Sequence, residues 1–229
     1  MNTTLADHIH AIGTRLTACS LSCPGIRLEP ASGIIPRSLV FEHQGRTGSF
    51  GSVALGINPG QGDEEERAYY LEHGSSYDQV LAFWMSRRRS SHRYHTRTRH
   101  FIDAAGLAGP ILWTEVVKCQ NPVGVRALPP LETRRTCVHL HLVNEMAEVP
   151  PAWPIVAIGK QPFELAAMMF PSRAVIGIPH PTGAFGDQFH SLFEASDDLR
   201  PEVRRLVDGI LSSNIPGAAW LGKDIDGAA

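Results

Sequence analysis

Apolar residues recur along the chain at intervals that predict several amphipathic helices. Near the N-terminus they repeat every three or four residues, which is typical of a helix over residues 4–18. A second helical face is formed by Tyr77, Val80, Leu81 and Trp84. Two more helices with one apolar face are expected near residues 131–147 and 161–170.

Short, continuous apolar runs bounded by Gly and Pro predict buried strands of a parallel sheet. Four such runs occur, at residues 53–55, 111–117, 155–159 and 174–178. The stretch between residues 23 and 51 is mostly loop, with room for a short strand at 38–41. Because strands alternate with helices, the predicted fold class is α/β: a three-layer α/β/α sandwich with a central, mostly parallel, four-stranded sheet.

Composition limits the class of protein further. The 229 residues are 43% hydrophobic and 19% charged, the formal net charge is -2, and no apolar run reaches membrane-spanning length. The N-terminal Met-Asn-Thr-Thr has neither the basic flank nor the apolar stretch of a secretory signal. We therefore expect a soluble, cytoplasmic monomer that does not bind membranes. A single domain over residues 1–229 is expected, with a tail that frays from about residue 213.

Two short motifs follow two of the predicted strands. Gly56-Ile57-Asn58-Pro59-Gly60 comes after the first strand, and His180-Pro181-Thr182-Gly183 comes after the fourth. Ligands of open α/β sheets bind at the carboxyl ends of the strands, so we expect Asn58 and His180 to open into one crevice. Each motif alone is common loop chemistry, and the shared location makes the pair informative.

The four cysteines form two pairs, Cys19 with Cys23 and Cys119 with Cys137. Structural disulfides are not expected in a reducing compartment. Their number and pairing, with three of the four in loop or loop-edge contexts, indicate one four-ligand metal site. Spacing alone leaves both an iron-sulfur cluster and a tetrahedral zinc ion open. Four buried thiols that act as small hydrophobic groups are the alternative.

A basic segment without carboxylates lies between residues 79 and 102. Its arginines are Arg87, Arg88, Arg89, Arg93, Arg97 and Arg99, interleaved with three histidines and Tyr94. Because the rest of the chain is neutral to acidic, the segment predicts a one-faced surface for phosphate contacts with nucleic acid. A solvated run of charges is the alternative.

Together these blocks resemble the uracil-DNA glycosylase superfamily, and most of all its iron-sulfur-containing branch, family 4. In that branch a cysteine pair precedes a strand ending in Gly-x-x-Pro-Gly, as at Gly56-Ile57-Asn58-Pro59-Gly60. The later blocks are Thr114-Glu115-Val116-Val117-Lys118-Cys119, a Pro-rich loop with Cys137 beyond it, the strand at 155–159 with its helix, and His180-Pro181-Thr182. The resemblance covers about residues 19–180. It implies a uracil-DNA glycosylase-like fold and a structural [4Fe-4S] cluster on the four cysteines, with zinc as the less favoured alternative.

Two features depart from the pattern of family 4. Members of family 4 usually carry an acidic residue at the second position of the first motif, where this chain has Ile57. The third position is Asn58, as in the mismatch-specific thymine/uracil branch of the superfamily. The resemblance then implies that Asn58 positions the attacking water, a role that needs alignment more than a strong base. The first cysteine pair is also separated by three residues rather than two.

Glu115 stands where the family places an asparagine that binds the Watson–Crick edge of uracil. Cytosine reverses the hydrogen-bonding pattern of uracil, with an acceptor at N3 and a donor at N4. A protonated glutamate matches cytosine because it accepts from N4 and donates to N3, and burial favours the protonated form. We expect Glu115 to bind the base; alternatively it points away and pairs with an arginine such as Arg126.

The resemblance also assigns the remaining site residues. Tyr69 or Tyr70 covers the flipped base, because the glycosidic bond cannot be reached inside duplex DNA. His180 donates to the base O2 as negative charge develops there. Contacts to DNA are expected from Gly60, Arg87, Arg88, Arg89, Arg93, Thr182, Gly183 and Phe185. Phe185 is either a wedge that fills the vacated stack or an ordinary core residue.

The sequence therefore predicts a monofunctional DNA glycosylase that leaves an abasic site. Some bacterial members of the superfamily defend against phage by removing bulky modified cytosines, including glucosylated 5-hydroxymethylcytosine, and the chain is compatible with that role. The expected partner is phage or damaged DNA with a modified pyrimidine. The alternatives are a uracil-DNA glycosylase of base excision repair and a non-catalytic iron-sulfur module that binds nucleic acid.

Overall fold

The structure, a computed structural model, describes residues 4–43, 45–124 and 127–222, with Arg88 described by its backbone alone. Contacts divide the chain into two compact units. The first unit comprises Met1–Glu42, Gly56–Ser91 and Leu112–Pro150; the second comprises His43–Leu55, His92–Ile111 and Pro151–Ala229. Each unit is therefore assembled from three separate stretches of sequence.

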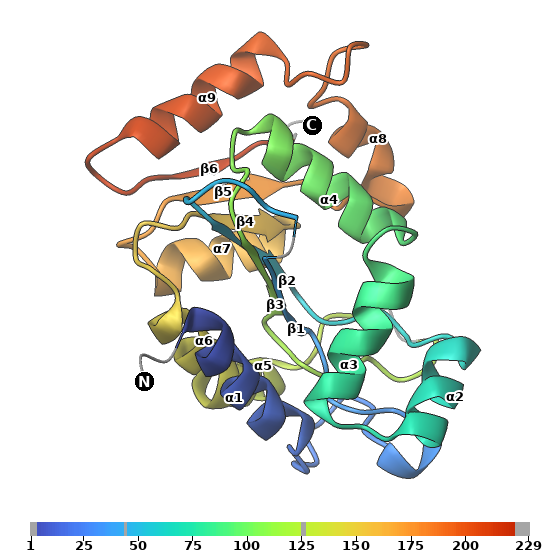
Figure 1. The fold of residues 1–229 in the computed structure, drawn as a ribbon. Helices are drawn as coiled ribbons and strands as arrows, with labels where there is room; N and C mark the ends of the chain where they lie inside the picture. Colours follow the sequence, from blue (N-terminus) through green and yellow to red (C-terminus); the bar gives the residue numbers. More distant parts are fainter. Residues whose placement is uncertain (1–3, 44, 125–126, 223–229) are drawn as a thin grey trace. The chain divides into compact units, whose positions relative to one another are not determined.

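Helix α1 (Leu5–Thr17) matches the predicted N-terminal helix. It begins with a capping box, in which the Thr4 side chain accepts from Asp7 N and the Asp7 carboxylate accepts from the Thr4 backbone N–H at 2.9 Å. Its apolar side is buried at Ile9, Ile12 and Leu16. In the first unit α1 packs against β1 (Leu39–Glu42), α3 (Tyr77–Phe83) and α6 (Val143–Glu148), which lies beside it in Figure 1.

The other elements of the first unit are mostly helical. A 3-10 turn, η1 (Pro30–Ser32), precedes β1, and α2 (Glu64–His73) precedes α3. Helix α3 continues into a π-helical turn, η2 (Trp84–Arg88). The helix predicted near 131–147 is confirmed as a continuous stretch made of α5 (Leu131–Cys137), the π-helical η3 (Val138–Leu142) and α6.

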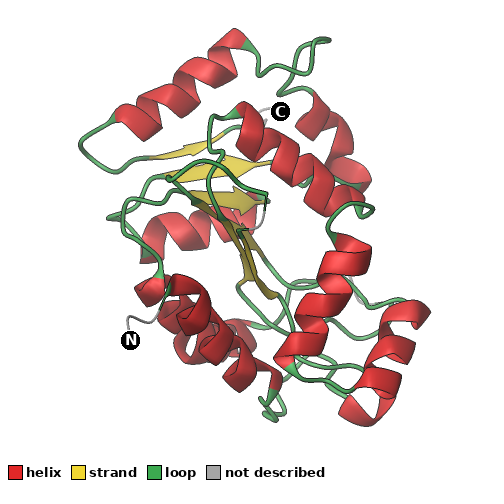
Figure 2. Cartoon of the chain, in the orientation of Figure 1, coloured by secondary structure: helices red, strands yellow, loops and turns green. Residues whose placement is uncertain are grey.

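The second unit contains most of the strands. Apart from Gly56, β2 (Ser52–Gly56) belongs to it, together with β4 (Ile155–Ile158), β5 (Val175–Ile178) and β6 (Ala218–Trp220). Its helices are α4 (Arg93–Ala104), α7 (Lys160–Met169), α8 (Gly186–His190) and α9 (Pro201–Ser212), with the 3-10 turn η4 (Gly183–Phe185) before α8. Helix α7 packs on β4 and β5, and α9 packs on β5 and β6 (Figure 2).

The sheet has more strands than expected. Six strands occur in the order β1-β3-β2-β4-β5-β6, where β3 is Ile111–Glu115, and β2, β4, β5 and β6 pair in parallel. The expected count of four strands is therefore wrong, because β1 and β6 extend the sheet at its two edges. Strand β1 falls at the short strand expected near 38–41, whereas β6 falls in the tail that was expected to fray. The three-layer arrangement stays a prediction.

Strand β6 depends on packing that its own sequence does not reveal. Trp220 lies against Phe163 of α7, with ring centroids 5.8 Å apart. Gly177 in β5 makes room for both rings, because a Cβ there would come within 2.6 Å of each. Ala218 and Ala219 carry no apolar alternation, so the strand forms because β5 and α7 supply its partners.

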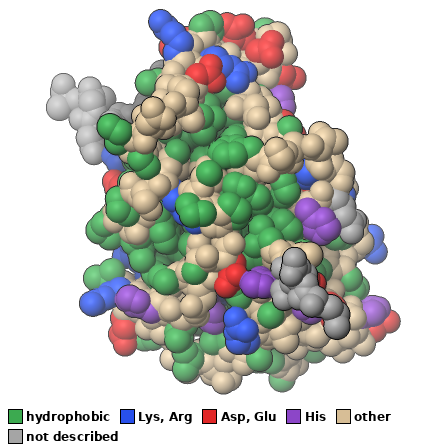
Figure 3. Space-filling view, turned by 60° about the vertical axis from the view of Figure 1, so that its left-hand side comes forward, with side chains coloured by type: hydrophobic (Ala, Val, Ile, Leu, Met, Phe, Trp, Pro, Cys, Tyr) green, Lys and Arg blue, Asp and Glu red, His purple; other side chains and the backbone are tan. Residues whose placement is uncertain are grey.

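Burial follows the pattern expected for parallel strands. Strands β4 and β5 are buried along their whole length, as is typical of strands covered on both faces. Apolar side chains reach the surface beside charged ones (Figure 3). Val123, Met168 and Ile215 are among the exposed apolar residues. Within residues 4–43, 45–124 and 127–222, the helices are too short or too polar to cross a membrane.

Candidate functional site

Asn58 and Glu115 are carried by neighbouring segments of the first unit. Glu115 is the last residue of β3, and Asn58 comes two residues after the end of β2. The backbone N–H of Val116 donates to Gly56 O at 3.0 Å, and the next residue along makes a second such bond at 2.9 Å. The stretch that leads to Asn58 therefore runs beside the stretch that follows Glu115.

The side-chain amide of Asn58 is oriented by a second asparagine. Asn58 Nδ2 donates to Asn121 Oδ1 at 3.2 Å, and Asn121 Nδ2 donates in turn to Ala127 O at 2.9 Å. This chain of bonds determines which way the Asn58 amide faces. Asn58 is partly buried, and its Oδ1 has no hydrogen-bond partner among the described residues. An amide oxygen held in this way can accept a hydrogen bond from water.

Glu115 carries a buried carboxyl oxygen. Its Oε2 is inaccessible to solvent and makes no hydrogen bond within the part of the chain that the structure describes. Burial raises the pKa of Glu115 to about 8, although Lys118 and Arg37 act in the opposite direction. The carboxyl group therefore keeps its proton at neutral pH. Arg126, its partner in the alternative interpretation, lies outside the described residues.

Lys118 is paired with a different carboxylate. Its side chain is buried, and Nζ lies 2.8 Å from Glu145 Oε2 and 2.5 Å from Thr114 Oγ1. Glu145 is also buried, and each member of such an ion pair needs the other to offset its lost hydration. Because its charge is engaged with Glu145, Lys118 lowers the pKa of Glu115 by less than burial raises it.

The two tyrosines expected near the base pack in the same apolar cluster but differ in exposure. Tyr70 is 4% exposed and packs in an apolar cluster with Ile35, Val80 and Phe83. The ring of Tyr69 stacks on His73, with centroids 4.4 Å apart, and Tyr69 remains partly exposed. Tyr70 is thus a core residue in this structure, and Tyr69 is the better placed of the two to contact a base.

The structure gathers the four cysteines in the first unit. Cys19 and Cys23 lie in the loop after α1, Cys119 follows β3, and Cys137 ends α5. All four line one small cavity, whose apolar walls include Leu21, Ile26, Val117 and Leu140. The sequence pairs Cys19 with Cys23 and Cys119 with Cys137, and the fold places both pairs around the same space.

The loop that carries Cys19 and Cys23 is fixed against α5. Thr133 Oγ1 donates to Pro24 O at 2.6 Å. Gly25 has a φ of 67°, and a Cβ at this position would lie 2.6 Å from Pro130. Both the left-handed backbone and the close approach require glycine. The loop is therefore held next to the helix that ends with Cys137.

The pKa of three of the four cysteine thiols is raised by burial. Burial raises the pKa of Cys119 to about 12, and the three neighbouring cysteines add to the effect. Burial also raises the pKa of Cys23 and of Cys137. Ionising several thiols in one buried place requires nearby positive charge, such as a metal centre supplies. Among the described residues, no three or more His, Cys, Asp and Glu side chains are grouped so as to hold a metal ion.

His180 lies in the second unit, two residues after the end of β5. The Thr182 backbone N–H lies 3.3 Å from His180 Nδ1, and Thr182 O lies 3.0 Å from the same nitrogen. Burial lowers the pKa of His180, so the imidazole is neutral at neutral pH. In the tautomer whose Nδ1 accepts from Thr182 N–H, Nε2 carries the proton and is a donor.

Helix α4 holds the loop that carries His180. Tyr94 lies beside the imidazole, with ring centroids 5.4 Å apart. Arg97 Nη1 donates to Pro181 O at 2.6 Å. These two residues of the basic segment therefore support His180 within the second unit.

An exposed aromatic ring follows His180. Gly183 begins the turn η4 with a φ of 71°, and Phe185 ends it. The Phe185 side chain is 43% exposed. The alternative in which Phe185 is an ordinary core residue is therefore wrong, and its role as a wedge stays a prediction.

The arginines of the basic segment are divided between the two units. Two of them form ion pairs in the first unit, Arg87 with Glu65 at 3.1 Å and Arg89 with Glu42 at 3.2 Å. The side chain of Arg88 lies outside the described residues, and Arg93 is exposed at the start of α4 in the second unit. Carboxylates from elsewhere in the chain therefore balance two of the six arginines, and the one-faced surface for nucleic acid stays a prediction.

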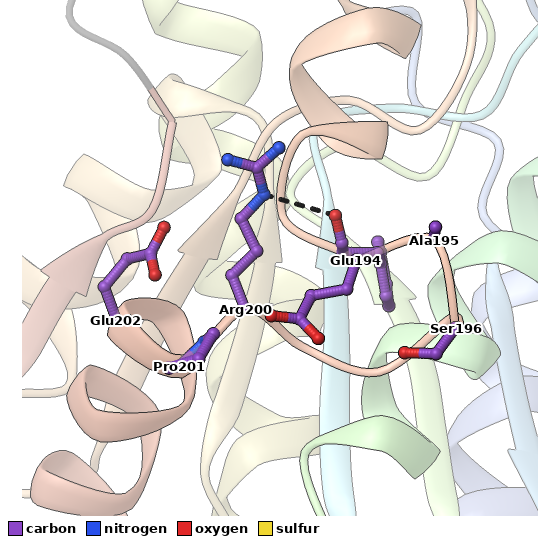
Figure 4. A pocket seen from close by; sticks show the side chains of 7 residues that line it. Glu194, Ala195, Ser196, Arg200, Pro201 and Glu202 are labelled. Carbon is purple, nitrogen blue, oxygen red and sulfur yellow. Dashed lines mark hydrogen bonds between the residues drawn. The ribbon is translucent and has the colours of Figure 1, made fainter.

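A surface pocket of about 630 Å³ lies in the second unit, near the start of α9. Figure 4 shows Arg200, Glu194 and Glu202 around it, and Arg200 Nε donates to Phe193 O at 3.2 Å. Its lining contains none of the site residues expected from the sequence. The pocket therefore contributes nothing to the site built around Asn58 or His180.

Sequence reasoning missed Asn121 and Arg37, which both contact the Asn58 segment. The available signal for Asn121 is the polar pair Gln120-Asn121 between a cysteine and a proline, directly after a predicted strand. Arg37 gives no such signal, because its partners Gly60 and Gln120 are remote in the sequence. Only the fold brings these residues to the motif.

The predicted site residues fall into two sets, one in each unit. The first unit holds Asn58, Glu115 and the four cysteines, and the second holds His180 and Phe185. That Asn58 and His180 open into one crevice stays a prediction, because they belong to different units. No protein-family model matches the chain, and no curated protein is significantly similar to it. The family resemblance therefore rests on the sequence motifs.

Proposed function

We propose that the protein is a DNA glycosylase that hydrolyses the N-glycosidic bond of a flipped-out modified pyrimidine and leaves an abasic site. The preferred base is a modified cytosine such as glucosylated 5-hydroxymethylcytosine, carried by phage or damaged DNA. The proposed fold is the three-layer sandwich of the uracil-DNA glycosylase superfamily. An α/β architecture with parallel strands, and four motif blocks in the family order, support this assignment.

The observation that carries the proposal is the pairing of Asn58 with Glu115 in the first unit. One side chain offers an oriented amide oxygen, and the other offers a buried carboxyl group that is protonated at neutral pH. Hydrolysis of a cytosine glycoside needs both, because water must be aligned at C1′ and the leaving base must be held. Backbone hydrogen bonds join the two segments that carry these groups.

Base recognition in this proposal depends on the proton of Glu115. The protonated carboxyl donates to cytosine N3 and accepts from the N4 amine, whereas uracil, with a donor at N3 and an acceptor at O4, needs the proton on the other carboxyl oxygen. Donation to N3 also eases the departure of cytosine, which is otherwise a poor anionic leaving group. The raised pKa and the unpartnered Oε2 support this role.

Asn58 and His180 act on the two ends of the breaking bond. Asn58 Oδ1 orients a water molecule for attack at the sugar C1′, without adding a charge that would compete with it. The neutral His180 donates from Nε2 to the base O2, where negative charge develops as the bond breaks. Thr182 offers Nδ1 both an N–H donor at 3.3 Å and a carbonyl acceptor at 3.0 Å, and the proposal requires the tautomer in which Nδ1 accepts.

Flipping of the nucleotide would use the exposed aromatic side chains. Phe185 fills the vacated position in the stack, and Tyr69 contacts the extruded base. Gly60 is exposed, with no atom within 4 Å of the position of an added Cβ, so its backbone allows a phosphate to approach closely. Arg93, Arg87 and Arg89 contribute contacts to DNA phosphates, and these contacts do not depend on the base sequence.

The four cysteines fit a [4Fe-4S] cluster with a structural role. Each iron of such a cluster takes one thiolate, so the sulfurs of its ligands lie farther apart than around one ion. Four thiols lining one cavity with apolar walls suit this donor set. A tetrahedral zinc ion would bring the sulfurs to about 3.8 Å from each other. A zinc ion stays the less favoured alternative for the same four thiols.

The proposal is tested with oligonucleotides that carry one uracil, cytosine, 5-hydroxymethylcytosine or glucosylated 5-hydroxymethylcytosine at the same position. Abasic sites are measured by alkaline strand cleavage under single-turnover conditions, with Asn58→Ala as the control variant. We expect the modified cytosines to be released fastest and Asn58→Ala to be inactive. Rapid uracil release with modified cytosine untouched would instead identify a uracil glycosylase, and no release from any oligonucleotide would identify a binding module.

A further inference from the structure

Arg37 joins three segments of the first unit around the turn that follows Asn58. Its Nε lies 3.0 Å from Glu66 Oε1 in α2, Nη2 donates to Gly60 O at 2.5 Å, and Nη1 donates to Gln120 Oε1 at 3.2 Å. The side chains of Arg37 and Glu66 are only 11% and 7% exposed. The guanidinium group is therefore held in one orientation, with a different partner for each of its nitrogens.

Gln120 completes this arrangement from the other side. Its Oε1 also accepts from Gly62 N at 2.9 Å. The backbone N–H of Arg37 also donates to Lys118 O at 2.9 Å. This bond holds the segment that carries Arg37 beside the segment that carries Gln120. Gln120 directly follows Cys119 in the sequence. The turn after Asn58 is thus bonded at Gly60 to Arg37 and at Gly62 to Gln120, the residue next to Cys119.

We propose that Arg37 and Gln120 are positioning residues, which fix the Pro59–Gly62 turn and thereby the place of the Asn58 amide. This inference rests on the proposed function. A planar guanidinium presents donors in three fixed directions, whereas a lysine ammonium is a single flexible point charge. Lysine at position 37 keeps the charge next to Glu66 but cannot hold Gly60 O and Gln120 Oε1 together.

The variants are chosen so that no buried charge is left without a partner. Arg37→Lys retains the ion pair with Glu66, and Gln120→Ala removes the acceptor of Gly62 N without touching a charge. Gln120→Glu retains an acceptor oxygen and places a negative charge beside Arg37, so it serves as the conservative rescue variant. Arg27→Lys is the control, because it alters only the two-bond ion pair of the Arg27 side chain with Glu29 and keeps the backbone bond from Arg27 N–H to Gln120 O.

The expected effect is on the chemical step and not on DNA binding. Arg37→Lys and Gln120→Ala should each lower the single-turnover rate about 10- to 100-fold, since a small misplacement of an aligning group has that cost. Dissociation constants for DNA should stay unchanged, and Gln120→Glu and Arg27→Lys should keep the rate. The double variant should lose little more than the larger single variant, because the two residues act on the same turn.

Amide hydrogen exchange gives a second measurement that does not depend on activity. Exchange at Gln61 and Gly62 should accelerate in Arg37→Lys and Gln120→Ala but not in Arg27→Lys, with the rest of the first unit unchanged. Unchanged exchange at the turn, or an unchanged rate in both variants, would overturn the inference. If the wild-type protein releases no base at all, the proposed function fails, and the exchange result still decides whether Arg37 and Gln120 hold the turn.

Discussion

The turn after Asn58 and the turn after His180 both follow a parallel strand, but they are held in different ways. The Asn58 turn is fastened by side chains from distant segments, namely Asn121, Arg37 and Gln120. The His180 ring is held by Thr182, two residues away, and the turn is supported by α4 through Arg97. The turn after His180 also exposes Phe185, whereas the turn after Asn58 exposes glycine backbone.

This difference indicates a division of roles between the two turns. A water-aligning group contributes through its exact position, so a rigid network of remote contacts suits Asn58. A turn that contacts DNA has to accommodate a bent and unstacked duplex, so local support and an exposed aromatic ring suit the His180 side. Substitutions in the two turns should therefore have different kinetic signatures.

The largest effect is expected for Asn58→Ala. Loss of the amide oxygen leaves the attacking water unaligned, and the single-turnover rate should fall about 1,000-fold while DNA binding is retained. The rate is measured by alkaline cleavage at the abasic site, and binding is measured by fluorescence anisotropy. A variant that retains its full rate would show that Asn58 does not align water.

His180→Ala should have the next largest effect. Removing one donor to developing negative charge costs about 100- to 1,000-fold in rate. The loss should be larger for unmodified cytosine than for a base with a more stable anion, because His180 stabilises charge on the departing base. Rates on cytosine and uracil oligonucleotides test this, and an equal loss on both would contradict the role.

Asn121→Ala sharpens the comparison of the two turns. It removes one hydrogen bond that orients Asn58, which is worth about 1 kcal/mol, so a rate loss of roughly fivefold is expected. Thr182→Val removes the contact of Thr182 Oγ1 with His180 Nδ1 at 3.2 Å, keeps the backbone N–H beside the ring, and is the matched variant in the other turn. If Thr182→Val were as damaging as Asn121→Ala, support by remote side chains would not distinguish the Asn58 turn.

The smallest effect is expected for Phe185→Ala, and it depends on the substrate. Loss of an exposed stacking ring should weaken binding to duplex DNA by about 1 to 3 kcal/mol, because the vacated stack is no longer filled. Single-stranded substrate has no stack to fill and should be bound and cleaved as before. Equal weakening on both substrates would argue against a wedge and for a general contact.

The sequence predicts those strands and helices whose buried residues form an unbroken apolar run or an apolar face. The runs at 155–159 and 174–178 are buried on both faces, so apolar composition alone marks β4 and β5. Helix α1 shows both its capping box and its apolar face in the sequence. By contrast, β6 consists of two alanines and a tryptophan, and its partners in β5 and α7 are set only by the fold.

The site is predictable where one residue acts through its own chemistry. Glu115 and the cysteines are visible because their side-chain types are unusual in their motifs. Arg87 and Arg89 appear unbalanced in the sequence, yet Glu65 and Glu42 reach them in space. Ion pairs between residues far apart in the sequence depend on the paths of the loops, so no local sequence pattern predicts them.

The most direct test of the account is the pH dependence of cytosine release. Glu115 has a pKa raised by burial to about 8, and the proposed contact with cytosine needs the protonated form. Release of modified cytosine should therefore be full below this pH and should fall as the pH rises through it, in step with loss of the proton. Glu115→Gln cannot ionise, so its rate should show no such fall. A wild-type rate that stays constant or rises through this range, or a fall that persists in Glu115→Gln, would contradict the account.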